Sequence, residues 1–125
     1  MAKRVLVVDD EAEMLTLIKF ALEKAGFEVS TCENGRHAWD EMLRLKPDLL
    51  ILDVMLPGLD GYSLQLKIAQ EAAVKEMPII VLTALEPSKT LFQKFPQVVA
   101  FMTKPFKTDD LVSASSAAVA RSSHT

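Results

Sequence analysis

Residues 5–10 read VLVVDD, so four apolar residues run directly into two aspartates. The same arrangement returns at residues 49–53, LLILD, where an apolar run again ends on an aspartate. Apolar runs that do not alternate with polar residues are typical of strands buried on both faces of a parallel sheet. The sequence therefore predicts a parallel sheet with acidic residues at the ends of two strands.

Three further runs along the chain resemble these two in length. Four of the five are rich in Val, Ile and Leu, whereas Glu28–Cys32 is mixed and is expected nearer an edge of the sheet. The predicted strands are Val5–Val8, Glu28–Cys32, Leu49–Leu52, Ile79–Leu82 and Val98–Met102.

Stretches with helical spacing separate the strands. The first helix is expected to begin with a capping box of Asp10 and Glu13 and to have Gly26 just beyond its end. Pro47 should stop the second helix, and Thr108 should cap a last helix over about 108–120. The apolar faces predicted for the first three helices comprise Met14, Leu15, Ile18, Leu22 and Ala25, then Ala38, Trp39, Met42 and Leu43, then Leu64, Ile68 and Ala72.

Strands that alternate with helices through short connections predict an α/β fold with right-handed crossovers. Five strands and about five helices suit the flavodoxin-like, doubly wound parallel sheet of order 2-1-3-4-5. The fourth helix should be short or distorted, because Pro87 and Pro96 bound the segment that would form it. In this order the first and third strands are neighbours at the point where ligands bind.

Composition favours one ordinary globular domain spanning 1–125, with its core over about 3–119 and a frayed tail at 120–125. The net charge of −3 does not indicate direct binding of nucleic acid or of a membrane surface. The apolar run at residues 5–8 is too short for a signal peptide or a membrane span. A single cysteine, Cys32, is expected to be buried and inert, and we expect a cytoplasmic protein.

Polar residues stand at four of the predicted strand ends. Asp9 and Asp10 follow the first strand, Asp53 the third, Thr83 the fourth and Lys104 the fifth. Because parallel strands end at one edge of a sheet, these side chains should converge there. Crowded carboxylates repel one another unless a cation neutralises them, and hard oxygen ligands suit Mg²⁺. A lysine and a hydroxyl beside them suit an incoming phosphoryl group, and a carboxylate can be its nucleophile.

The motifs VLVVDDE, LLILDVMLPGLDGY, IIVLTA and MTKPF together resemble the receiver domain of two-component response regulators. The resemblance covers almost the whole chain, from Lys3 to about Val119. It implies a signalling phospho-acceptor that catalyses only its own phosphorylation and dephosphorylation. The partner would be a histidine kinase or a histidine phosphotransfer protein, and phosphorylation would switch a protein-interaction surface.

The resemblance also implies a role for each site residue. Asp53 would be the phospho-acceptor, and Mg²⁺ would be held by Asp9, Asp10, Asp53 and the main-chain carbonyl of Met55. Thr83 and Lys104 would contact the phosphoryl group, and Thr83 and Phe101 would form the switch. The Lys104–Pro105 pair indicates a fixed geometry that is compatible with a cis bond.

Residues 85–101, LEPSKTLFQKFPQVVAF, depart from the family pattern. Family members usually carry a polar helix here, and this surface is their usual output face. We therefore expect partner binding or dimerisation to differ from the common pattern. The chain is expected to be a monomer or a phosphorylation-dependent dimer, acting alone or as a piece of a longer regulator, with an unidentified downstream partner. Met55 and Leu85 flank the expected path of water, so the aspartyl phosphate should be fairly long-lived.

Three other functions have sequence requirements that differ from those of a receiver domain. A non-phosphorylated receiver-like interaction module would have lost an acid, the threonine or the lysine, and the sequence keeps all of them. A haloacid dehalogenase-type phosphatase places a second Asp two residues after its nucleophile, where this chain has Met55. A flavodoxin-like electron carrier needs a phosphate loop of Ser, Thr and Gly after the first strand, where this chain reads DDEAEM. The first alternative remains open, because an unusual fourth helix would be able to uncouple phosphorylation from output.

Overall fold

The computed structural model describes residues 2–53, 61–74, 76–83 and 95–122. Within them lies a five-stranded parallel sheet of order β2-β1-β3-β4-β5, which confirms the predicted flavodoxin-like fold. The mixed strand β2 lies at one edge, as expected. The strands are β1 (Arg4–Val8), β2 (Glu28–Cys32), β3 (Leu49–Asp53), β4 (Ile79–Thr83) and β5 (Val98–Thr103).

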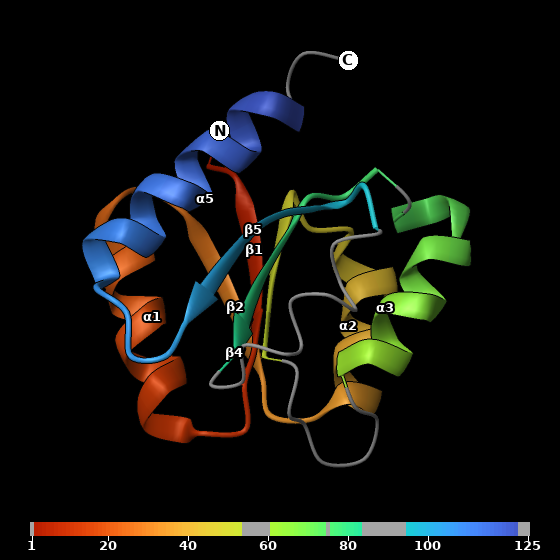
Figure 1. The fold of residues 1–125 in the computed structure, drawn as a ribbon, viewed down its shortest axis with the longest axis horizontal. Helices are drawn as coiled ribbons and strands as arrows, with labels where there is room; N and C mark the ends of the chain where they lie inside the picture. The colour runs from red at the N-terminus through yellow and green to blue at the C-terminus, as the bar shows by residue number, and fades with distance from the viewer. Residues whose placement is uncertain (1, 54–60, 75, 84–94, 123–125) are drawn as a thin grey trace.

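Helices cover both faces of the sheet (Figure 1). One face carries α1 (Ala12–Lys24) and α5 (Thr108–Ser122), and the other carries α2 (Gly35–Leu45) and α3 (Gly61–Gln70). A short 3₁₀ helix, η1 (Ala72–Val74), follows α3. The predicted short or distorted fourth helix falls largely on residues 84–94, outside the described part of the chain.

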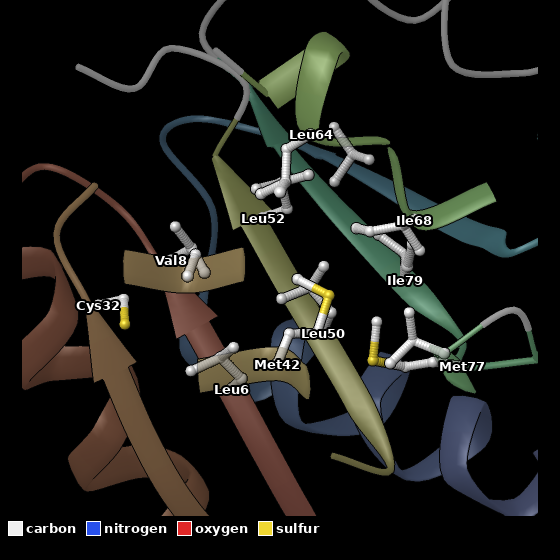
Figure 2. Packing of buried hydrophobic residues seen from close by; sticks show 13 residues of the cluster. Leu6, Val8, Cys32, Met42, Leu50, Leu52, Leu64, Ile68, Met77 and Ile79 are labelled. Atoms are coloured by element: carbon white, nitrogen blue, oxygen red, sulfur yellow. The ribbon is translucent and has the colours of Figure 1, made fainter. Parts of the chain in front are cut away.

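Each central strand supplies side chains to two separate cores, because successive residues of a strand point to opposite faces. On one face Leu6, Leu50 and Ile79 pack with Met42 of α2 and Ile68 of α3, as Figure 2 shows. On the other face the strands pack against α1 and α5 in a second cluster, which includes Val7, Ile51, Ile80, Leu15, Ile18 and Leu111. The side chains named in these two lists are buried, so the sheet forms a rigid platform for whatever stands at its ends.

The helix ends differ from the sequence predictions in several places. The N-cap of α1 is Glu11 rather than Asp10, and its side chain makes no capping hydrogen bond. The capping-box prediction was therefore wrong. Thr108 is the first helical residue of α5 rather than its cap, and α5 runs to Ser122 rather than Ala120. Such ends depend on which backbone N–H groups find partners, which local sequence determines only weakly.

Two apolar-face predictions also need correction. Ala25 is the C-cap of α1 and is exposed, so it does not contribute to the core. Ala72 lies in η1 and is exposed, because α3 ends at Gln70. Gly26 follows α1 with a φ of +100°, the left-handed conformation expected of a residue just past a helix end. The end of α2 at Leu45, two residues before Pro47, agrees with the prediction.

No helix among the described residues is both long enough and apolar enough to span a membrane. Cys32 is buried at the end of β2, as predicted. The Lys104–Pro105 bond is cis, as the Lys-Pro pair allowed.

Candidate functional site

The two buried aspartates of the site are placed by neighbouring strands. Val8 lies beside Leu52 in the register of β1 and β3, so the next residues, Asp9 and Asp53, stand side by side at the ends of these strands. Asp9 is fully buried and Asp53 is 4% exposed. Asp9 is held further because its backbone N–H donates to the carbonyl of Cys32. Two carboxylates are thus fixed side by side at the carboxyl edge of the sheet.

Lys104 lies directly after β5 and reaches back over this edge. Its ammonium group lies 2.8 Å from Asp9 Oδ2, 3.2 Å from Asp53 Oδ2 and 3.2 Å from Glu11 Oε1. The lysine side chain is only 13% exposed. A charged group so far removed from water is stable only when it is paired, and three carboxylates provide that pairing.

The pKa of Lys104 is set by two opposing effects. Burial alone would lower the pKa of this lysine, because it disfavours the charged form. The hydrogen bond from the ammonium to Asp9, together with the charges of Asp53 and Asp9, outweighs burial and raises the pKa. Lys104 is therefore a permanent cation at neutral pH.

The acidic residues also fit a divalent cation. One carboxylate oxygen from each of Asp9, Asp10 and Asp53 lies within 4.8 Å of the other two. Opposite ligands of an octahedral Mg²⁺ lie roughly 4 Å apart, and this ion usually keeps several waters beside one or two carboxylates. Asp10 is exposed, so the oxygen cluster opens towards solvent on one side. The donor set and its spacing are suitable for Mg²⁺.

The remaining predicted site residues are described to different extents. Thr83 is the last residue of β4, beside Thr103 in the register, so its backbone lies at the same edge. Met55 lies outside the described residues. Phe101 pairs in register with Val81 and packs, half-buried, against the core on the α2 and α3 side of the sheet. A packing role for Phe101 is visible here, and its role as a switch is a prediction.

Glu11 is a site residue that the sequence did not lead us to predict. Its backbone N–H donates to Asp9 Oδ1 at 2.9 Å, and its carboxylate lies 3.2 Å from the ammonium of Lys104. The available signal was the third acid of the VLVVDDE motif. Only the folded chain shows that Glu11 lies beside Lys104, because the two residues are far apart in sequence.

A parallel α/β sheet with an acidic cluster and a lysine at the ends of β1, β3 and β5 defines a class of domains that handle phosphoryl groups. The chain belongs to the response regulator receiver domain family, whose model matches residues 5–116. It is thus a receiver domain of two-component systems, a family of signalling phospho-acceptor domains.

Two relatives with curated functions are transcriptional regulatory proteins. The chain is 38% identical over 113 residues to the alkaline phosphatase synthesis transcriptional regulatory protein PhoP of Bacillus subtilis, with 85% of this chain and 44% of that protein covered. It is 39% identical over 112 residues to the phosphate regulon transcriptional regulatory protein PhoB of Pseudomonas aeruginosa, with 88% and 48% covered. The chain therefore spans about half the length of these relatives.

A solved receiver domain gives a close structural match. The receiver domain of a sensor histidine kinase from Pseudomonas aeruginosa superposes with a TM-score of 0.86 at 27% identity, covering 96% of this chain and 99% of that one. That structure has a magnesium ion coordinated in its active-site cleft.

Proposed function

We propose that Asp53 accepts a phosphoryl group from a phosphohistidine on a histidine kinase or a histidine phosphotransfer protein. The observation that carries the proposal is the meeting of Asp9, Asp10 and Asp53 with the ammonium of Lys104 at one sheet edge. The family and the relatives support it, since receiver domains are phospho-acceptors that partner with such proteins.

In the proposed transfer, a carboxylate oxygen of Asp53 attacks phosphorus in line with the leaving imidazole nitrogen. The phosphorus–oxygen bond forms as the phosphorus–nitrogen bond breaks, and the imidazole keeps the electron pair and takes up a proton. Lys104 offsets charge that develops on the phosphoryl oxygens, because its ammonium lies 3.2 Å from the attacking carboxylate. Thr83 would contact the same oxygens.

Asp9, Asp10, Asp53 and the main-chain carbonyl of Met55 would hold Mg²⁺. When bound, this ion supplies positive charge that brings the phosphoryl group and the carboxylate together. The magnesium bound to the Pseudomonas receiver domain supports this assignment. Phosphorylation would then draw Thr83 towards the phosphoryl group and let Phe101 turn, biasing an interaction surface between two states.

We further propose that residues 1–125 act as one receiver domain whose output is a protein contact, without direct nucleic-acid or membrane binding. A receiver-like module that is not phosphorylated remains the second candidate. The presence of Asp53, Lys104 and the acidic pair weighs against it.

Mass spectrometry after incubation with acetyl phosphate and Mg²⁺ tests the proposal. The native chain should gain one phosphate, and Asp53→Asn should gain none. Asp40→Asn is a matched control, because Asp40 is an exposed aspartate in the middle of α2. An adduct on Asp53→Asn, or none on the native chain, would reject Asp53 as the acceptor.

A further inference from the structure

We propose that Glu11 is a positioning residue for Lys104, and that it holds the ammonium in place while Asp53 is phosphorylated. The inference rests on the proposed function and assigns a role to a residue outside the expected acceptor, metal and switch sets. An ammonium group has three N–H donors. Among the described residues the ammonium has three carboxylate neighbours, Asp9, Asp53 and Glu11, which equal those donors in number.

The side chain of Glu11 is available because it does not cap its own helix. Glu11 is the N-cap of α1, a position where Ser, Thr, Asp or Asn would satisfy a free backbone N–H. Its side chain makes no such bond and lies instead 3.2 Å from Lys104. The chain therefore forgoes a helix cap and makes a contact with the site lysine.

Asp9 joins the two halves of this arrangement. Its Oδ1 accepts from the backbone N–H of Glu11 at 2.9 Å, and its Oδ2 accepts from Lys104 at 2.8 Å. The contact between Lys104 and Glu11 closes a ring of three residues. Asp9 is fully buried, so the ring is anchored on the rigid end of β1.

The ring has a consequence for phosphoryl transfer. Once Asp53 carries a phosphoryl group, one of its oxygens is bonded to phosphorus, and the donor that faced this carboxylate is free to turn to a phosphoryl oxygen. The other two donors remain on Asp9 and Glu11. Lys104 thus exchanges one partner and stays where it is, so little reorganisation is needed as the charge develops.

The alternative hypothesis is that Glu11 acts only through its negative charge near the site. The two hypotheses predict opposite changes in the rate of phosphorylation when Glu11 is removed. If charge alone matters, removing Glu11 should speed the reaction with an anionic donor, because repulsion falls. If Glu11 positions Lys104, removing it should slow the reaction.

The test measures the rate of phosphorylation at Asp53 by acetyl phosphate at saturating Mg²⁺. We expect Glu11→Ala to lower the rate about two- to fivefold, as suits a contact whose carboxylate side is 62% exposed. Glu11→Gln should restore most of the rate, since the amide oxygen still accepts from Lys104. Glu13→Ala is the matched control, because it removes an exposed acid from the same helical turn. Its rate should equal the native rate.

A second measurement reads the position of Lys104 without phosphorylation or metal. In the native chain and Glu13→Ala, the side-chain ¹⁵N–H signal of Lys104 should be protected from exchange with water. In Glu11→Ala that protection should fall severalfold. An unchanged signal, a faster reaction, or equal slowing in Glu13→Ala would overturn the role of Glu11. If the native chain takes up no phosphate, the proposed function fails, and this signal alone decides whether Glu11 holds Lys104.

Discussion

Lys104 Nζ donates a 2.8 Å hydrogen bond to Asp9 Oδ2, joining two residues that are 95 positions apart in the chain. The bond connects the end of β1 to the residue after β5, across β3, which carries Asp53, and β4. The same lysine therefore neutralises buried carboxylates in the resting protein and, in the proposed transfer, would meet the phosphoryl group. Stability and the proposed chemistry share one cation.

Replacing this cation should destabilise the protein. Lys104→Met leaves the buried Asp9 and Asp53 carboxylates unneutralised, so we expect the free energy of unfolding in urea to fall by about 3 kcal/mol without metal. The exposed Lys107→Met should change it by less than about 0.5 kcal/mol. Saturating Mg²⁺ should reduce the difference in unfolding free energy between the native chain and Lys104→Met. A loss no larger than that of the control would show that the pair contributes little to stability.

The stability that Lys104 contributes depends on pH, and the direction of its pKa shift determines how. The pKa of Lys104 is raised in the folded chain, so its contribution is fully present below the unfolded pKa of about 10.4 and is lost as pH rises through the folded value. The stability difference between the native chain and Lys104→Met should therefore stay nearly constant from roughly pH 7 to pH 9. A difference that shrinks steadily across this range would contradict the raised pKa.

Mg²⁺ should stabilise the folded chain through the acidic cluster. At a concentration about 100 times the dissociation constant, a ligand that binds only the folded state adds about 2.7 kcal/mol. We expect a matching rise in the thermal midpoint of the native chain, and a much smaller one in Asp9→Asn. Asp40→Asn, an exposed change on α2, should respond like the native chain. An equal rise in Asp9→Asn would mean that the ion binds elsewhere.

Gln65 on α3 offers a route to a more stable protein. Its side chain is fully buried, and neither amide atom has a hydrogen-bond partner among the residues that the structure describes. A buried polar group without a partner costs about 1–3 kcal/mol. Gln65→Met, which is similar in length and apolar, should therefore raise the free energy of unfolding in urea by about 1–2 kcal/mol.

The matched control for this change is Gln70→Met, on the exposed last residue of the same helix. It should leave stability within about 0.5 kcal/mol. A destabilised Gln65→Met would indicate that the amide is satisfied in solution, for instance by a buried water.

Cys32 should react slowly with thiol reagents. Burial raises the pKa of its thiol, and the nearby charge of Glu41 raises it further, so the reactive thiolate is scarce at neutral pH. The rate of modification by a chromogenic disulfide should be at least tenfold lower in the native chain than in urea, and should rise with pH. Glu41→Gln should speed it slightly, since that variant removes the smaller of the two effects. A native rate close to that in urea would contradict the burial of this thiol.

The sheet and most of the site can be predicted from the amino-acid sequence alone. Unbroken apolar runs such as Leu49–Leu52 require burial on both faces, and parallel strands place the residues after them at one edge. The edge position of β2 and the meeting of Asp9, Asp53 and Lys104 follow from that reasoning, whereas the strand order was expected from the likeness to the flavodoxin-like fold. The burial of the strands and the convergence of their ends depend on the spacing of apolar residues and on the order of the elements along the chain. Both can be read directly from the sequence.

The partners of individual side chains, by contrast, depend on how the chain folds. The sequence alone did not distinguish Asp10, which was predicted to cap the first helix, from Glu11, which reaches Lys104. Glu11 became a site residue because Asp9 holds its backbone and leaves its side chain facing the lysine. Ala72 fell outside the core because α3 ended at Gln70, and Gln65 was buried with no hydrogen-bond partner in the described part of the chain. Such outcomes depend on distances between segments remote in sequence, and local propensity carries no information about those distances.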